Sequence, residues 1–516
     1  MSKLLLGVIV TKMFLLGPIP LPFIGNLHVL FRHEPGYSAY EMWRKKYGPI
    51  YTYWIGETSF GSHPFIMISD YKTIRDTFVK DGEAYAGKFH FNEARKLFRG
   101  GDYGVVETVG HMWRDHRRFA IHVLRDLGLS KDVMERRASI LAEVEAMSES
   151  LHAMKGKEIA MQDIFDVGVG SVINQLLFGY RFEGDNLKEF RELKGMISRH
   201  LKEFSHPSGS IMFLYPWLKI LPYFENKWKK LVNVFFLKTY HYFFQPRILF
   251  HLNTLILHRE AFFSFFDRQI EAHQKDIDFE TEESNDYVEA FLKEKRRREA
   301  NGDSESFSYL QLQNMCLDLW IAGMETTSNT LSWGVVYLLN NLHVQEKLHE
   351  EMDREIGSGR LVTMSDRNNL PYTSAVINEI QRMANLLPMN LPHQTLCTVQ
   401  VGKWSIPAHT GVIAQISNVL YDDEVFPSPH TFDPSRFIDD SGRLKKVEEL
   451  IPFSIGKRQC LGEGLARMEL FLFIANLFNR FKLSCVNADE PPSMKKLFAL
   501  TVQPRPYRCL AEPRFD

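Results

Sequence analysis

A single cysteine lies in a glycine-rich loop directly in front of an apolar helix, and this feature constrains the chain more than any other. The loop, residues 453–462, reads Phe-Ser-Ile-Gly-Lys-Arg-Gln-Cys-Leu-Gly, and apolar residues at helical spacing follow it. Loop N–H groups and the positive end of the helix dipole lower the pKa of a cysteine, as a metal-ligating sulfur requires. Glycines let the backbone approach a flat cofactor, and Arg458 can pair with a carboxylate at its edge. The pattern therefore predicts that Cys460 is a metal ligand.

The spacing within this loop is specific, whereas the other cysteines carry no such pattern. Phe, Gly, Arg, Cys and Gly at these five positions should arise by chance in roughly one chain of this length in ten thousand. The chain has five cysteines and no C-x-x-C pair, so neither a disulfide scaffold nor a structural zinc site is expected. The remaining cysteines are interpreted as small buried hydrophobic residues: Cys316, Cys397, Cys485 and Cys509.

The loop resembles the haem-binding loop of the cytochrome P-450 superfamily, in which this cysteine is the axial ligand of the haem iron. Four further segments agree in order and spacing, and the resemblance extends from about Gly17 to the C-terminus. It is closest to the animal microsomal members that oxidise drugs and fatty acids. The resemblance implies a mainly α fold with small β-sheets, a single-domain prism around a buried haem b.

A long apolar stretch, residues 314–342, predicts a buried helix, yet its middle reads Ala-Gly-Met-Glu-Thr-Thr from Ala322 onward. Ala322 and Gly323 leave the helix surface bare, so a ligand on the iron can approach, while Glu325 and Thr326 can bind water and relay protons. Alternatively, the threonine only bonds back to a carbonyl one turn earlier and bends the helix. In the family that the loop resembles, the threonine and its acidic neighbour form a proton-delivery pair for O–O cleavage, which thiolate ligation favours.

Trp113 and Arg117 stand one turn apart at the start of a predicted helix, so an indole N–H and a guanidinium can reach the same anionic group. Arginine-rich helix faces are usually only solvated, and a lone histidine is more often structural than functional. The resemblance nevertheless implies that Trp113 and Arg117, together with His393 and Arg458, hold the haem propionates.

An acid and a base three residues apart, Glu379 and Arg382, lie on one face of another predicted helix. Such a pair ordinarily contributes only about 0.2–0.5 kcal/mol. The resemblance implies instead that Glu379, Arg382 and Arg436 form a structural network on the haem side of the core, with a role in stability and haem retention. Two further pairs with the same spacing are interpreted as solvated: Glu294 with Arg297, and Glu351 with Arg354.

Hydrophobic periodicity predicts a mainly helical chain with a minor β part. Strands are expected at 50–55 and 65–68, and a hairpin at 399–415. Helices are expected at 71–79, 113–124, 131–153, 161–177, 186–204 and 310–342. The run of charged residues at 293–300 is interpreted as a solvated helix end or loop.

The 516 residues would ordinarily suggest several domains, but no low-complexity linker interrupts the chain between Gly48 and Pro513. We expect one haem-thiolate catalytic domain, residues 28–516, after a short hydrophobic anchor at 1–16 and a Pro-rich hinge at 17–27. As a helix the apolar start reaches roughly 20 Å, short of the roughly 30 Å hydrocarbon core of a bilayer.

An apolar and aromatic segment, residues 232–257, has no counterpart in the family pattern and contains no acidic residue. One interpretation is an added membrane-contacting element, because interfacial aromatics suit a bilayer boundary. The other is translated non-coding sequence, because the segment is biased toward Phe, Tyr, Leu, Ile, Asn and Lys.

The 62 basic and 63 acidic residues leave a net charge of -1, so no field attracts nucleic acid. The resemblance implies electron transfer from a separate NADPH-dependent flavoprotein reductase, with cytochrome b5 as a further candidate donor. It also implies a membrane surface as partner, at the endoplasmic reticulum, with the catalytic domain on the cytoplasmic side. The cations expected near the donor are Arg114, Arg118, Lys445, Lys446 and Lys457.

The substrate is expected to be a lipophilic small molecule, either a fatty acid or a xenobiotic, bound by four largely apolar segments: 85–103, 321–326, 386–391 and 497–501. Apolar linings discriminate by only about 1–3 kcal/mol per methylene, so the substrate stays open. Two alternative functions also stand: a haem-thiolate isomerase or dehydratase that needs no reductase, and a haem-binding sensor or inactive relative. Relatives of the first kind usually lack the acid–alcohol pair.

Overall fold

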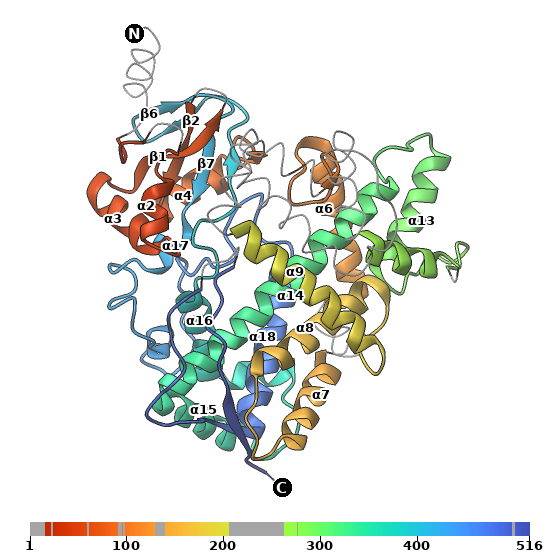
Figure 1. Ribbon diagram of the computed structural model, residues 1–516, viewed down its shortest axis with the longest axis vertical. Helices are drawn as coiled ribbons and strands as arrows, with labels where there is room; N and C mark the ends of the chain where they lie inside the picture. The colour runs from red at the N-terminus through yellow and green to blue at the C-terminus, as the bar shows by residue number, and fades with distance from the viewer. Residues whose placement is uncertain are drawn as a thin grey trace, which may run out of the picture.

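Strands from the amino-terminal region and from residues 393–414 form a β-sheet that lies against a larger helical body (Figure 1). The computed structural model describes residues 16–21, 24–58, 61–90, 95, 99–129, 140–205, 263–275, 277–497 and 501–515. The atypical segment 232–257 and residues 1–15 of the expected anchor lie outside this described part of the chain. The mainly α fold with small sheets agrees with the expectation from the sequence.

The largest sheet has five strands in the order β1-β2-β7-β4-β3. β1 and β2 pair antiparallel, with Tyr53 opposite Phe65, and β7 then pairs parallel to β2. The strands within the described residues are β1 (Ile50–Thr58), β2 (Gly61–Ile68), β3 (Gly87–Lys88), β4 (His393–Gln394), β5 (Val399–Val401), β6 (Trp404–Ile406), β7 (Gly411–Ala414), β8 (Phe481–Cys485) and β9 (Cys509–Pro513).

The hairpin expected at 399–415 is shorter than predicted. β5 and β6 pair with each other through a turn at 402–403, but β7 leaves the hairpin and joins the larger sheet. The apolar run of β7 is buried at all its positions, as is usual for a strand inside a sheet. Hydrophobic periodicity predicts a strand here but does not show whether β7 pairs with β6 or with β2.

Helices make up most of the body. Their bounds are α2 (Leu27–Arg32), α3 (Tyr37–Tyr47), α4 (Tyr71–Ile74), α6 (Gly110–Leu124), α7 (Ile140–Ala153), α8 (Met161–Phe178), α9 (Asn186–Ser205), α13 (Tyr287–Ala300), α14 (Tyr309–Asn340), α15 (Leu342–Glu355), α16 (Pro371–Ala384), α17 (Ile416–Leu420) and α18 (Glu463–Arg480). Shorter π and 3-10 turns are η1 (Arg75–Lys80), η2 (Arg125–Leu129), η4 (Met364–Asn369) and η5 (Pro434–Phe437). The expected helix at 131–153 is present as α7 from Ile140, and residues 131–139 lie outside the described part.

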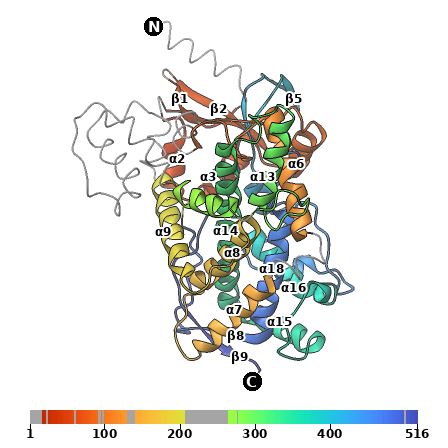
Figure 2. The ribbon, with the colours of Figure 1, turned by 90° about the vertical axis from the view of Figure 1, so that its right-hand side faces the viewer.

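α14 is the central element of the helical body, and it packs against α8, α16 and α18 (Figure 2). Its start follows from the sequence, because the Ser308 side chain accepts a hydrogen bond from the Gln311 N–H and so caps the first turn. Most of its residues are buried, as the nearly continuous apolar run predicted. The helix ends at Asn340, two residues short of the expected end, and α15 begins at Leu342.

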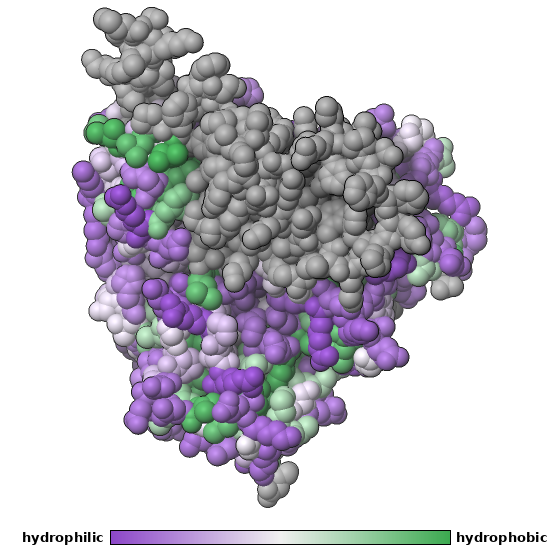
Figure 3. Space-filling view, in the orientation of Figure 1, coloured by the Kyte–Doolittle hydropathy of each residue, from purple (hydrophilic) through white to green (hydrophobic). Residues whose placement is uncertain are grey.

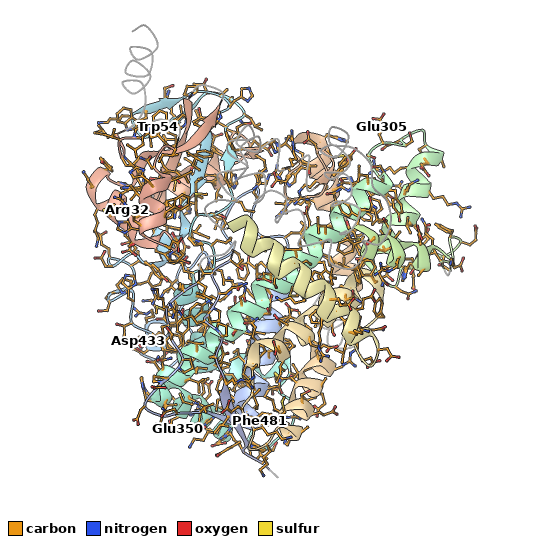
Figure 4. The ribbon with its side chains drawn as sticks, in the orientation of Figure 1. Arg32, Trp54, Glu305, Glu350, Asp433 and Phe481 are labelled. Carbon is orange, nitrogen blue, oxygen red and sulfur yellow. The ribbon has the colours of Figure 1, made fainter. Side chains whose placement is uncertain are left out.

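Two of the residues labelled in Figure 4 lie in the helical body. Asp433 lies beside α16, and Phe481 lies at the lower end of the body, where β8 follows α18. α18 begins three residues after Cys460, so the cysteine loop enters directly into a helix that packs on α14.

Candidate haem site

The loop that carries Cys460 is held by backbone contacts that require its glycine. The Cys460 N–H donates to the Phe453 carbonyl at 3.1 Å, which closes the loop. Gly456 has a φ of +92°, and a Cβ there would stand 2.0 Å from the Phe78 carbonyl oxygen. Any larger residue would therefore push the loop away from η1, and glycine is required for this packing.

The Cys460 side chain is exposed on one side, but protein surrounds the sulfur closely enough elsewhere that burial raises the pKa of its thiol. The Gly462 N–H and the charge of Arg117 act in the opposite direction without outweighing burial. The expectation that the loop alone lowers this pKa is therefore wrong. Bound iron would supply the missing stabilisation, because a metal deprotonates its thiol ligand.

The other cysteines differ in burial. Cys316 and Cys509 are buried as expected, whereas Cys397 is exposed and Cys485 is half-buried. The reading of Cys397 as a buried hydrophobic residue is therefore wrong.

Arg458, Arg117 and Trp113 come together beside the cysteine loop. Arg458 donates to the carbonyls of Ala86 and Thr108 at 2.9 and 2.8 Å, and its guanidinium carbon lies 3.8 Å from the Trp113 ring centroid. The Arg117 Nη2 donates to the Gln459 carbonyl at 2.6 Å. The Arg458 Nη1 is buried and, among the described residues, has no hydrogen-bond partner.

His393 lies in β4 next to the same group of cations. Its Nδ1 is 2.8 Å from the Tyr85 carbonyl oxygen, which can only accept a hydrogen bond, so we assign the proton to Nδ1. Burial, followed by Lys88 and Arg458, lowers the pKa of His393 to about 3, so the ring is neutral. Its Nε2 is then an acceptor, and contact with a carboxylate through Nε2 requires a second proton, which the carboxylate itself would favour.

A surplus of buried positive charge makes this region suited to an anion. Burial lowers the pKa of Lys88 to about 8 and that of Arg458 to about 9, and it also lowers the pKa of Arg117. Glu107 acts on both Lys88 and Arg458, and its own pKa falls to about 2 because His90 and the surrounding cations outweigh burial. Asp318 also acts on Lys88 but is paired with Arg99, so a surplus of cations remains. This surplus and the unpaired guanidinium nitrogen fit the two propionates of a haem.

The sequence reasoning missed Lys88. This side chain is 6% exposed and lies in β3, directly after Gly87, where a Cβ would stand 2.4 Å from the Gln394 carbonyl oxygen. A glycine before an isolated lysine is too common to signal burial, so only the strand pairing with β4 revealed the position.

On α14, Ala322 is exposed in the middle of an otherwise buried helix, and Thr326 is half-buried one turn later. The Thr326 Oγ1 donates to the Ala322 carbonyl at 2.6 Å, which is the back-bonding alternative weighed for this residue. The same geometry leaves the hydroxyl oxygen able to accept a hydrogen bond. Gly323 is half-buried, and a Cβ there would stand 2.9 Å from Ile173 of α8, so this glycine also allows close helix packing.

Glu325 points to a different side of α14 and is almost fully buried. Its Oε2 lies 2.8 Å from the Lys194 Nζ of α9. Its Oε1 accepts hydrogen bonds from Asn329 at 3.1 Å and Gln503 at 2.6 Å. The acid of the expected acid–alcohol pair is thus held by three donors from α9, α14 and the C-terminal segment.

Glu379 and Arg382 form a bidentate pair in α16, with both N–O distances 2.7 Å and both side chains 0% exposed. Arg382 also donates to the carbonyls of Leu420 and Pro429, at 3.0 and 2.7 Å. The Arg436 Nε lies 3.2 Å from the same carboxylate. The three residues expected to form a network are therefore in contact, and the two in α16 lie deep in the core.

Glu351 corrects a sequence expectation. It was expected to form a solvated pair with Arg354, but it is 3% exposed and accepts hydrogen bonds from the Tyr372 and Thr373 amides at 2.8 Å. It therefore caps the start of α16, where a carboxylate meets the positive end of the helix dipole. Arg354 pairs with Glu355 instead. In the pair of Glu294 with Arg297, the arginine is solvated as expected, with 64% of its side chain exposed, whereas Glu294 is only 15% exposed and also pairs with Arg298.

Segments far apart in the sequence are joined to α14 by hydrogen bonds and an ion pair. Asp318 accepts hydrogen bonds from the Val105 and Val106 amides at 2.8 and 3.0 Å and pairs with Arg99 at 2.6 Å. From the C-terminal side, the Val502 carbonyl accepts from the Trp333 indole at 3.0 Å.

The Val502 N–H also donates to the Leu386 carbonyl at 2.9 Å. Of the expected substrate-binding segments, 85–103 meets α14 through Arg99 and Asp318, 497–501 meets it through Thr501 and Asn329, and 386–391 is joined to it through Val502. Residues 91–94, 96–98 and 498–500 lie outside the described part.

The comparisons with known proteins agree with this arrangement. The family model of cytochrome P-450 matches residues 15–511. The chain belongs to the cytochrome P-450 family. It is 33% identical over 500 residues to cytochrome P-450 2C29 of Mus musculus, covering 96% of this chain and 94% of that protein. It is 32% identical over 503 residues to cytochrome P-450 2H1 of Gallus gallus, covering 96% and 93% of the two chains.

Membership makes this protein a cytochrome P-450 monooxygenase with the single-domain fold of that family. Haem, when bound, supplies the redox chemistry by which such an enzyme activates dioxygen.

Proposed function

We propose that this protein inserts one atom of dioxygen into a lipophilic small molecule, a fatty acid or a xenobiotic, with electrons from an NADPH-dependent flavoprotein reductase. The observation that carries the proposal is the face of α14 on which Ala322 is exposed and the Thr326 hydroxyl lies beside it. A small side chain leaves room for a substrate, and an adjacent alcohol can handle protons there. Cytochrome b5 is a second candidate electron donor.

Each residue near the cysteine loop has a proposed task in holding haem b. Cys460 binds the iron through its thiolate. Arg117, Arg458 and the Trp113 indole bind the propionates, for which the surplus of buried cations supplies the attraction. His393 joins them once its Nε2 takes up a proton.

Glu325 and Thr326, the acid and the alcohol of α14, have different proposed roles in proton transfer. Thr326 donates its own hydrogen to the Ala322 carbonyl, so its oxygen accepts a hydrogen bond from a group in front of Ala322. Proton exchange between Glu325 and that hydroxyl requires the Glu325 carboxylate to turn away from its donors on Lys194, Asn329 and Gln503. Glu379, Arg382 and Arg436 take no part in the chemistry and stabilise the core behind the haem.

A membrane surface is the proposed location, at the endoplasmic reticulum with the catalytic domain on the cytoplasmic side. Leu16, Ile19 and Leu21 are 74%, 87% and 44% exposed at the start of the described chain. Figure 3 shows hydrophobic residues gathered at the upper left, on the same side as the amino-terminal end. Such exposed apolar side chains suit an interfacial contact. Among the described residues, no helix is both long and apolar enough to span a bilayer.

The reductase is proposed to dock where exposed cations surround the loop of Cys460. Arg114 and Lys457 are exposed, and both lie within 3.0 Å of Glu83, so this acid already offsets part of their charge. Arg118 is exposed on the same helix as Arg114. Reduction by the flavoprotein should slow as salt rises, because surface charges are screened over about 10 Å at 0.1 M ionic strength.

Reconstitution tests the proposal directly. The purified holoprotein is combined with a microsomal NADPH-dependent reductase in phospholipid vesicles and offered polyunsaturated fatty acids and lipophilic drug-like compounds. Oxygenated product that appears only with reductase, NADPH and dioxygen, and that carries label from ¹⁸O₂, is the expected result. Conversion of a lipid hydroperoxide without reductase, and no NADPH-dependent product from any compound, would support an isomerase instead.

A further inference from the structure

A lysine from a distant segment closes the C-terminal end of α16. The Lys496 Nζ donates to the carbonyls of Met383 and Ala384 at 2.7 and 2.6 Å, and to the Tyr421 Oη at 2.7 Å. Both carbonyls belong to the last turn of α16, where the helix dipole is negative and the helix itself offers no further N–H. Lys496 therefore caps α16 from more than 110 positions away in the chain.

Each hydrogen of the Lys496 ammonium has an acceptor. The Tyr421 hydroxyl donates its own hydrogen to the Met383 carbonyl at 2.8 Å, so its oxygen is free to accept from Lys496. Aromatic rings also surround the ammonium, because the ring centroids of Tyr37, Tyr421 and Trp333 lie 4.6, 5.3 and 5.8 Å from Nζ. Burial lowers the pKa of Lys496 well below its ordinary value. The three oxygens and the rings compensate for that loss of hydration.

Lys496 stands directly before one of the expected substrate-binding segments, 497–501. Leu497 and Gln503 exchange backbone hydrogen bonds at 2.8 and 3.2 Å, so the chain is paired with itself at this point. The later side of this pairing is joined to the end of α16 as well, because the Val502 N–H donates to the Leu386 carbonyl at 2.9 Å. Lys496 and Val502 thus attach both sides of the pairing to the same place.

The other expected substrate-binding segment that leaves α16, residues 386–391, begins at this place. Asn385 follows α16 in the left-handed conformation, with a φ of +45°, and its Nδ2 donates to the Ser417 carbonyl at 3.0 Å. The Asn385 carbonyl accepts a hydrogen bond from the Tyr37 hydroxyl. Tyr37 therefore contacts both the start of this segment and the Lys496 ammonium.

We propose that Lys496 is a positioning residue for substrate specificity: it holds the segment 497–501 against the end of α16 and so sets its distance from the segment 386–391. The proposal rests on the proposed function and on the expectation that both segments contact the substrate. Lys496 itself touches neither haem nor substrate. It acts because a small shift of one apolar wall changes which carbon of a bound molecule is presented for oxidation.

Amide hydrogen exchange in the haem-loaded protein tests the positioning without any substrate. Lys496→Met removes the ammonium and keeps a side chain of similar length, and Tyr421→Phe removes one of its three acceptors. Lys495→Met is the matched control, because Lys495 is the exposed neighbour of Lys496. Exchange in the peptide that covers residues 495–505 should quicken roughly tenfold or more in Lys496→Met, as for a lost hydrogen bond to a charged group, and less in Tyr421→Phe.

The control should exchange at the wild-type rate. Unchanged exchange in Lys496→Met would overturn the proposal, because the lysine would then not hold the segment.

The specificity is measured as the ratio of oxygenated regioisomers that the reconstituted holoenzyme forms from linoleic acid and from testosterone, each of which offers several oxidisable carbons. The ratio should change roughly threefold or more in Lys496→Met and stay at the wild-type value in Lys495→Met. Each variant is first checked for haem content and for its reduced carbon monoxide spectrum. A merely structural role for Lys496 would lower the Tm or the haem content and leave the ratio unchanged, because a ratio does not depend on the amount of active enzyme.

Leu387→Ala distinguishes the failure of this proposal from that of the proposed function, because Leu387 is half-buried within the segment 386–391. If Leu387→Ala changes the ratio and Lys496→Met does not, only the role of Lys496 is wrong. If neither variant changes the ratio, the two segments do not contact the substrate, and the role of Lys496 in specificity is wrong with them. If the wild type forms no NADPH-dependent product from either compound, the proposed function itself is contradicted.

Discussion

The guanidinium carbon of Arg458 lies 3.8 Å from the centroid of the Trp113 ring, and the same arginine donates to two backbone carbonyls. The stacking fixes the plane of the guanidinium, so the unpaired Nη1 has a defined direction. Arg458 and Trp113 are more than 340 positions apart in the chain, and they lie together at one side of the haem site.

Arg458→Lys should weaken haem binding because lysine can neither stack nor present a planar fork. A hydrogen bond to a charged group contributes about 1.5–3 kcal/mol, which corresponds to roughly 10- to 100-fold in affinity. Haem transfer from the holoprotein to an excess of apomyoglobin measures the loss. Arg443→Lys, on an exposed turn, is the control and should release haem at the wild-type rate.

Cys460→Ala should abolish the red-shifted Soret band of the reduced carbon monoxide complex, because only a thiolate donates enough electron density to the iron. Difference spectra of the reduced protein with carbon monoxide report it. Cys397→Ala removes an exposed cysteine outside the loop and should retain the band. A red-shifted band in Cys460→Ala would mean that another residue is the ligand.

Thr326→Ala should keep haem and the carbon monoxide spectrum but divert electrons from NADPH into hydrogen peroxide. Positioned proton-transfer groups contribute about 10²–10⁴-fold to rate, so coupled turnover should fall by roughly tenfold or more. The measurement is the ratio of product and peroxide to NADPH consumed. Thr330→Ala is a matched control, since Thr330 back-bonds to the Thr326 carbonyl in the same way one turn later. Equal coupling in the two variants would reduce Thr326 to a helix-bending residue.

Glu379→Gln should destabilise the fold strongly, because Arg382 would remain buried without its carboxylate. Breaking a buried pair costs about 3–5 kcal/mol, whereas an exposed pair contributes about 0–1 kcal/mol. Thermal unfolding and haem retention of the holoprotein measure the effect. Glu294→Gln breaks a pair with the same spacing in which the arginine is 64% exposed, and should lower the Tm less. Similar Tm values for the two variants would contradict a structural network around Glu379.

Glu469 should make stability fall as pH rises. Burial raises its folded-state pKa to about 8 from an ordinary value of 4.5, so between these pH values the unfolded chain releases a proton that the folded chain keeps. Folding therefore becomes less favourable from pH about 4.5 to pH about 8. The Tm of Glu469→Gln should lack this component, and parallel Tm–pH curves for the wild type and the variant would contradict it.

Local patterns in the sequence were sufficient for several elements of the fold and for the cysteine loop. The helix through Glu325 follows from an apolar run, and the strand from Ile50 follows from β-branched and aromatic residues. Both depend on interactions within a few residues or on a strong periodicity. The loop around Cys460 could also be predicted from the sequence, because its glycines lie within a few residues of the cysteine.

Tertiary structure alone decided which charged residues are buried and with what they pair. Lys88, Lys194 and Glu351 look in the sequence like the solvated charges around them, and each turns out to be buried or nearly so. A side chain's desolvation and its Coulomb partners depend on elements distant in the chain, as when α8, α9 and α14 meet at Lys194. The residue types that could bind haem were therefore predictable from the sequence. The burial and the charged neighbours that set their pKa values arise only when distant segments pack together.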